Sequence, residues 1–172
     1  MTYNYFAIVV STLALAACGE ESAPSAQPTS VAQAEPAPQA EPAEQIGYHV
    51  AVYKNESCGC CKAWVKHLQQ AGFSVQVRNL DNLGPVKERV GVPVAMGACH
   101  TAEVGSYFIE GHVPADDIKR LLRERPEAKG LTVPGMPAGS PGMEVPSGKV
   151  QPYDVFLVSK DGTTSVYAHH GG

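Results

Sequence analysis

Three thiols occupy four consecutive positions in the segment Cys58-Gly59-Cys60-Cys61. The preceding residues 49–53 are typical of a β-strand, and the following residues 62–72, which end in glycine, are typical of a helix. The thiols are therefore expected at a helix N-terminus, where the helix dipole and unpaired backbone N–H groups favour thiolate over thiol. Thiolates this close together either chelate a soft metal ion or exchange disulfides.

The spacing of the three cysteines leaves both chemistries open. Cys58 and Cys61 have the two-residue separation of a redox pair, with Cys58 as the attacking and Cys61 as the resolving thiol. Cys60 complicates that mechanism, because three close thiols scramble among alternative disulfides. Cu(I) favours sulfur, needs only two or three ligands and accepts bridging thiolates, whereas the cysteines of a tetrahedral zinc site usually come as separated pairs. Structural disulfides are a third alternative, although they usually staple distant loops.

Further candidate ligands lie downstream of the cysteine cluster. Cys99 and His100 form a second pair of soft and borderline donors, and His112 precedes a predicted helix. In an α/β fold, a strand from a later part of the chain can pass beside a site at the start of a helix. We therefore expect these three residues to join the cluster as metal ligands.

Met136 and Met143 lie in a segment rich in glycine and proline, with little other apolar bulk. A lone methionine usually fills a gap in the core, but thioethers also ligate Cu(I) whatever the pH. Both methionines are therefore candidate copper ligands. The role of His169 and His170 near the C-terminus stays open. No glycine-rich phosphate loop, Ser/His/Asp arrangement or carboxylate pair stands out.

The elements that position these residues follow a recognisable order. Strand, helix, strand, helix, strand, strand and helix are expected at residues 49–53, 62–72, 73–78, 83–90, 98–104, 106–110 and 114–126. With cysteines between the first strand and helix, this order resembles a thioredoxin-like core. The predicted fold class is α/β: a thioredoxin-like core with an added Gly/Pro/Met loop (133–146) and a C-terminal β-hairpin (153–168). Either hairpin could be the central pair of the sheet.

The N-terminal part predicts an exported, anchored protein. Residues 6–17 form an apolar run too short to span a bilayer, and Leu15-Ala16-Ala17-Cys18 resembles a bacterial lipoprotein signal in which Cys18 is lipidated. No Lys or Arg precedes Cys18, which departs from the usual basic start, and an uncleaved signal or a soluble exported form is the alternative. We expect a periplasm-facing envelope protein, anchored to a membrane by lipid.

Residues 19–46 are rich in Ala, Pro, Glu, Gln and Ser, which predicts a disordered tether. The predicted organisation is thus a signal (1–18), a tether (19–46) and a metal-binding domain (47–172). The chain carries 13 basic and 17 acidic side chains, and five of the acids lie in the tether without a base. The near-neutral domain that remains gives no sign of nucleic-acid binding.

Taken together, these motifs resemble the CopG-like family of bacterial envelope proteins associated with copper resistance. The similarity extends over most of the predicted domain. It includes the cysteine segment 58–62, Gly91-Val92-Pro93, Cys99-His100-Thr101-Ala102, residues 110–114 and residues 133–144. The resemblance implies a thioredoxin-like fold, and copper held by Cys58, Cys60, Cys61 and Cys99 with help from His100 and His112.

The function expected on this basis is copper resistance, with more than one Cu(I) held in a thiolate cluster. Copper redox activity, and with it the question of whether the protein is an enzyme, stays open. One alternative is a thiol–disulfide oxidoreductase that uses Cys58 and Cys61; another is a passive copper metallochaperone. A copper efflux system or an electron-transfer protein is the expected type of protein partner.

Overall fold

The computed structural model describes residues 48–172. The predicted signal, the lipidation residue Cys18 and the predicted tether lie outside the described residues. Within the described part, no helix combines the length and apolar character needed to cross a membrane.

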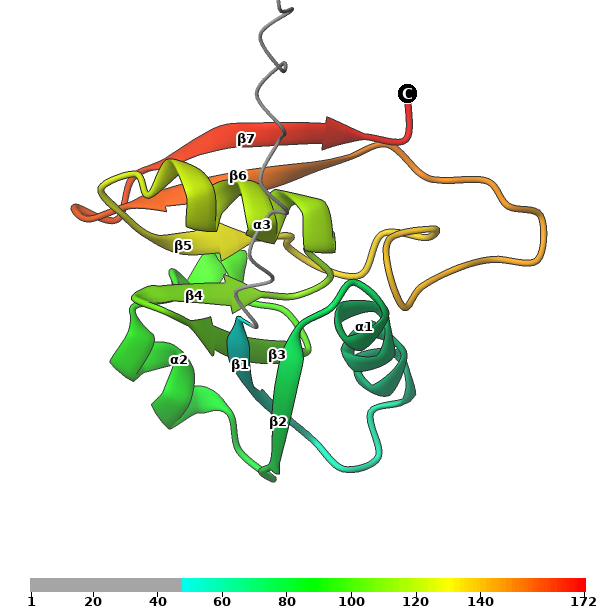
Figure 1. The fold of residues 1–172 in the computed structure, drawn as a ribbon, viewed down its shortest axis with the longest axis horizontal. Helices are drawn as coiled ribbons and strands as arrows, with labels where there is room; N and C mark the ends of the chain where they lie inside the picture. The colour runs from blue at the N-terminus through cyan, green and yellow to red at the C-terminus, as the bar shows by residue number, and fades with distance from the viewer. Residues whose placement is uncertain (1–47) are drawn as a thin grey trace, which may run out of the picture. The chain divides into compact units, whose positions relative to one another are not determined.

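A single mixed sheet of seven strands runs through the described residues, in the order β2-β1-β3-β4-β5-β6-β7 (Figure 1). The strands are β1 (His49–Lys54), β2 (Ser74–Asn79), β3 (His100–Val104), β4 (Tyr107–Glu110), β5 (Ala128–Thr132), β6 (Tyr153–Ser159) and β7 (Thr164–His170). The helices are α1 (Gly59–Gln70), α2 (Gly84–Val90), α3 (Ala115–Glu124) and a 3-10 turn, η1 (Val94–Met96).

The strand directions agree with the predicted thioredoxin-like core. β1 and β2 are parallel and joined by α1, whereas β3 runs antiparallel to β1 and β4 antiparallel to β3. The hairpin β3–β4 therefore lies in the middle of the sheet, while the C-terminal hairpin β6–β7 extends it to one edge. This arrangement settles which of the two predicted hairpins is central.

Strand β5 is the one strand of the sheet that was not predicted from the sequence. It follows α3, lies parallel to β4 and joins the core to the C-terminal hairpin. Its sequence, AKGLT, contains residues that are depleted in strands. Gly130 is nevertheless required, because a Cβ there would overlap the Phe108 carbonyl oxygen on β4. Gly130 is thus required by close backbone packing against β4. The local sequence does not reveal this contact, which explains why the strand was not predicted.

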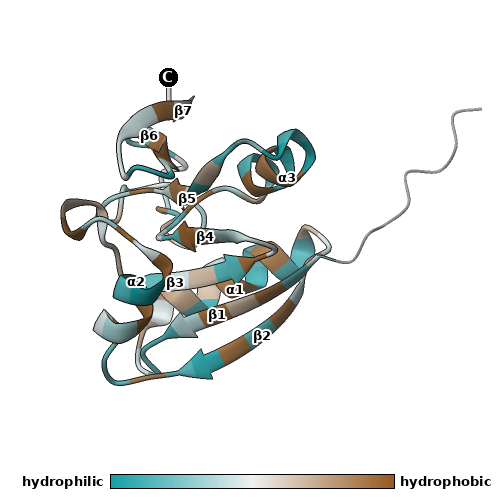
Figure 2. Ribbon diagram, turned by 90° about the vertical axis from the view of Figure 1, so that its left-hand side faces the viewer, coloured by the Kyte–Doolittle hydropathy of each residue, from teal (hydrophilic) through white to brown (hydrophobic). Residues whose placement is uncertain are grey.

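The two faces of the sheet are covered differently. Helix α1 buries Cys61, Trp64, Val65 and Leu68, a spacing that places them on one face of the helix. One large core cluster contains Trp64, Val65 and Leu68 of α1 together with the buried apolar residues of α3. A smaller cluster around Val92 and Phe108 packs on the other face, where α2 lies. Figure 2 shows the apolar and polar residues that alternate along edge strand β2.

Candidate metal centre

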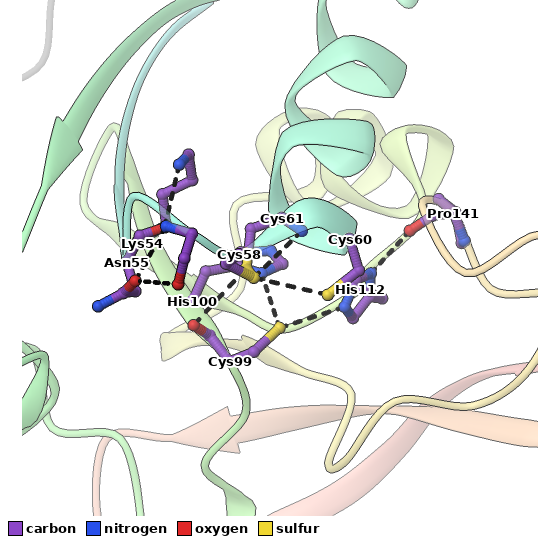
Figure 3. Close-up of a disulfide and its surroundings, with 10 residues drawn as sticks. Lys54, Asn55, Cys58, Cys60, Cys61, Cys99, His100, His112 and Pro141 are labelled. Carbon is purple, nitrogen blue, oxygen red and sulfur yellow. Dashed lines mark hydrogen bonds between the residues drawn. A yellow bond between two sulfur atoms is a disulfide. The ribbon is translucent and has the colours of Figure 1, made fainter.

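The cysteine segment forms the first turn of α1, as predicted. Cys58 is the N-cap residue, and its Sγ accepts a hydrogen bond from the Cys61 backbone N–H at 3.3 Å. Cys58 and Cys61 are joined in a disulfide, whereas Cys60 is free and its Sγ lies 3.5 Å from that of Cys58 (Figure 3). The helix start thus presents one oxidised pair and one thiol side by side.

Cys99 brings a fourth sulfur to this turn from a distant part of the chain. It directly precedes β3, which pairs with β1 so that His100 lies opposite Lys54 at the end of β1. The loop into β3 therefore meets the segment that leaves β1 for α1. The Sγ atoms of all four cysteines lie within 4.8 Å of one another. The sequence predicts that Cys99 comes close to this turn, and the sheet register explains how it does so.

Two histidines complete the group around Cys99. The Cys99 Sγ lies 3.3 Å from Nδ1 of His100 and 3.2 Å from Nε2 of His112 (Figure 3). Both histidine side chains are fully buried. Cys99 therefore belongs to two potential metal-binding groups, one of four sulfurs and one of a sulfur and two imidazoles.

Burial keeps these side chains neutral. Burial is the main cause that lowers the pKa of His100 to about 3, and the nearby His112 and Lys87 lower it further. Burial also lowers the pKa of His112. Each imidazole therefore retains a nitrogen lone pair at neutral pH. Burial, reinforced by Cys60, raises the pKa of the Cys99 thiol to about 12, so a metal ion has to displace its proton.

The donor set fits a soft metal ion. Thiolates and imidazoles suit copper and zinc, whereas magnesium and calcium require oxygen. The His100 Nε2 atom is buried without a hydrogen-bond partner among residues 48–172. An unpaired buried nitrogen costs free energy in the folded protein, which is expected where a ligand is to be received.

Trp64 supports His100 from helix α1. Its indole N–H donates to the Val113 carbonyl at 2.9 Å, and its ring centroid lies 4.4 Å from that of His100. The indole thereby ties the helix that carries the cysteines to the segment that carries His112. This role of Trp64 was not predicted from the sequence, although Trp64 is the only tryptophan and lies three residues after the last cysteine of the cluster.

Glu110 supports the Cys99 segment from the opposite face of the sheet, and the sequence analysis missed it too. This fully buried carboxylate pairs with Lys87 of α2. It also accepts hydrogen bonds from the Ala98 N–H at 2.6 Å and from the Thr101 hydroxyl at 2.7 Å. It thus binds the chain on both sides of Cys99 and His100, through a backbone N–H at Ala98 and a side-chain hydroxyl at Thr101. A single acid at the end of the apolar strand YFIE was the available signal.

The remaining candidates are placed less centrally. The Met136 side chain is 54% exposed, and Met143 is half-buried. His169 lies 2.6 Å from Asp154, and His170 lies 2.6 Å from Asp117 and stacks on Tyr153. The C-terminal histidines thus pair with carboxylates that belong to β6 and α3.

His67 of α1 has a structural role that leads to a pH prediction. Its Nε2 accepts a hydrogen bond from the Ala115 N–H at 3.0 Å, the first amide of α3, and burial lowers the pKa of His67. The unfolded chain therefore takes up this proton at a higher pH than the folded protein, so stability should fall as the pH drops below about 6.5. Urea unfolding at pH 7 and pH 5 should show that the free energy of unfolding falls less for His67→Gln than for the native protein, because glutamine cannot be protonated in this range. An equal loss in both proteins would refute this role.

Comparison with known proteins gives the chain a family. Residues 96–143 match the family described as "Protein of unknown function, DUF411". No curated protein matches the chain. Two solved structures, forms 1 and 2 of the copper resistance protein copG, are each 45% identical to it with a TM-score of 0.68. Each alignment covers 72% of this chain and 98% of the solved one, so the chain belongs to the family of CopG copper resistance proteins.

Proposed function

We propose that this protein acts in copper resistance by holding Cu(I) in a cluster of the thiolates of Cys58, Cys60, Cys61 and Cys99. His100 and His112 complete the ligand set. The observation that carries the proposal is that Cys99 brings three further sulfurs and two neutral imidazoles together around its own sulfur. Membership in a family of copper resistance proteins supports copper as the ion.

The chemistry of the donors favours Cu(I) over other soft ions. Cu(I) accepts two or three sulfur ligands, and a thiolate can bridge two ions. Four sulfurs within 4.8 Å of one another suit such bridging, so more than one ion is expected. Only the reduced protein offers all four, because the Cys58–Cys61 disulfide must first take up two electrons and two protons to become two thiols. Loading with Cu(I) then displaces the thiol protons.

The proposed setting is the bacterial envelope. A lipid on Cys18 and a tether over residues 19–46 would hold the copper-binding domain on the periplasmic side of a membrane. The apolar run before Cys18 and the Pro- and Glu-rich composition after it support this placement. An efflux or electron-transfer partner would then receive copper or electrons from the domain.

Cys60 distinguishes copper binding from simple thiol redox. The full chain, reduced with a phosphine and kept anaerobic, is titrated with Cu(I) against a chromophoric Cu(I) chelator. Cys60→Ser should bind fewer copper ions than the native chain, because it removes the sulfur that makes the motif more than a redox pair. Cys18→Ser, which changes a cysteine outside the domain, is the matched control and should leave the stoichiometry unchanged. Native stoichiometry in Cys60→Ser would contradict the proposal.

A thiol–disulfide oxidoreductase is the second candidate, and the Cys58–Cys61 disulfide favours it. Cys58 is partly exposed and Cys61 is fully buried, which is the arrangement of an attacking and a resolving thiol. In this function, Cys61→Ser traps a mixed disulfide on Cys58, and Cys99 and His112 are dispensable. Loss of thiol–disulfide exchange activity in Cys99→Ser would reject the oxidoreductase function.

A further inference from the structure

The loop between β5 and β6 packs directly against the candidate metal centre. In Figure 1 it leaves the sheet and passes beside α1 before it returns as β6. Gly142 has a φ of +85°, and a Cβ on it would lie 2.7 Å from both the Cys60 carbonyl oxygen and the Trp64 backbone nitrogen. Only a glycine therefore allows the loop to rest on the first turn of α1, where the cysteines are.

The same loop hydrogen-bonds to a candidate ligand. His112 Nδ1 lies 2.8 Å from the carbonyl oxygen of Pro141, the residue before Gly142 (Figure 3). A carbonyl oxygen can only accept a hydrogen bond, so the proton of the neutral imidazole is on Nδ1. The lone pair is then on Nε2, the atom that lies 3.2 Å from the Cys99 Sγ.

We propose that residues Pro141 and Gly142 are positioning residues, which fix the tautomer and orientation of His112 so that Nε2 faces the copper site. The proposal rests on the proposed function for the identity of the ion. It gives the Gly/Pro/Met loop a purpose other than thioether ligation: the backbone of the loop acts, and the sulfurs of Met136 and Met143 are dispensable. A backbone carbonyl that holds the second nitrogen of a ligating histidine raises its basicity and fixes its ring.

The internal contacts of the loop support this role. The Ser140 side chain is fully buried, and its hydroxyl donates to the Pro137 carbonyl at 2.7 Å. The Gly142 N–H donates to the Glu144 side chain at 2.8 Å, and the Met143 N–H donates to the Ser140 carbonyl at 2.8 Å. These bonds make a tight turn around Pro141, so the position of its carbonyl is set by the loop itself.

Gly142→Ala tests the proposal most directly, because its methyl group has to push the loop off α1. Gly135→Ala is the matched control: Gly135 lies in the same loop with a φ of +71°, and a Cβ on it meets nothing within 4 Å. Both variants therefore carry similar backbone strain, and only Gly142→Ala displaces Pro141. Ser140→Ala loosens the turn without adding an atom, which keeps the proposal testable if Gly142→Ala does not fold. Met136→Leu/Met143→Leu removes both thioethers at nearly constant volume.

Two measurements on the full chain separate positioning from ligation. Long-range ¹H–¹⁵N NMR of histidine-labelled, metal-free protein reports the tautomer of His112, and competition with a Cu(I) chelator reports affinity for Cu(I). The native protein, Gly135→Ala and the methionine variant should show the proton on Nδ1 and equal affinity. Gly142→Ala and Ser140→Ala should show a second tautomer and bind Cu(I) about 10-fold to 100-fold more weakly, as is usual when a partner of a ligating histidine is lost.

The results that would overturn the proposal are equally specific. They are an unchanged tautomer in Gly142→Ala and Ser140→Ala, or a loss of affinity in the methionine variant as large as that in Gly142→Ala. The NMR measurement needs no copper. If the native protein bound no Cu(I), the proposed function would fail, while the tautomer would still decide whether the loop positions His112.

Discussion

Cys99→Ser is expected to weaken Cu(I) binding more than any other single substitution in the domain. Cys99 contributes its sulfur both to the four-cysteine group and to the group with His100 and His112. A serine hydroxyl is a hard donor that does not replace a thiolate on Cu(I). Loss of a residue that only hydrogen-bonds to a metal ligand typically lowers metal affinity about 10-fold to 100-fold. Loss of the ligand Cys99 itself should therefore lower the affinity for Cu(I) by more than about 100-fold. Competition with a Cu(I) chelator on the reduced, anaerobic protein measures it.

The fold should survive this substitution, which makes the result interpretable. Cys99 is partly exposed, and serine is only slightly smaller. The midpoint of urea unfolding of the metal-free protein should therefore change little. If Cys99→Ser kept the native affinity and stoichiometry, Cys99 would not join the two groups of donors, and the account of the centre would be wrong.

Glu110→Ala is expected to produce the largest loss of stability. It leaves Lys87 without its buried partner, and it removes the acceptor for the Ala98 N–H and the Thr101 hydroxyl. Loss of one member of a buried ion pair typically costs about 3–5 kcal/mol, and Lys87, which is 21% exposed, regains part of its hydration. We therefore expect the free energy of unfolding to fall by about 3 kcal/mol.

Glu103→Ala is the matched control for this prediction. Glu103 also faces α2, from the neighbouring strand β3, but its bidentate pair with Arg89 is solvent-exposed, with side chains 31% and 54% exposed. Exposed pairs contribute about 0–1 kcal/mol, so this variant should unfold almost like the native protein. Urea unfolding of both variants provides the comparison. Equal losses would show that Glu110 is not a special support of the Cys99 segment.

The sequence predicts the centre well where the signal is local. The sequence shows three cysteines around a helix start, a Cys-His pair before a strand and a histidine before a helix, which are the sulfur and imidazole donors that the structure brings together. The strand–helix–strand order then predicts that they meet, because the loop into β3 lies next to the start of α1. The hairpin at the C-terminus is likewise predicted from its alternation and its turn residues.

The missed features depend on contacts between distant segments. Strand β5 has a weak local pattern, because Gly130 is there for close approach to β4 and not for strand propensity. Glu110 looks like the exposed end of a strand until α2 places Lys87 against it. His67 resembles a solvent-facing position of α1, yet α3 brings an unpaired amide to it. The spacing of residues within one helix or strand does not indicate which residues of another element will contact it.

X-ray absorption at the copper edge of the reduced, Cu(I)-loaded full chain tests the central claim most directly. If the cysteine cluster and its histidines hold the metal, the first shell should contain mostly sulfur with some nitrogen. A copper–copper distance should also appear, because bridging thiolates bring the ions together. A first shell of oxygen and nitrogen without sulfur would contradict the account, as would sulfur ligation to a single isolated ion.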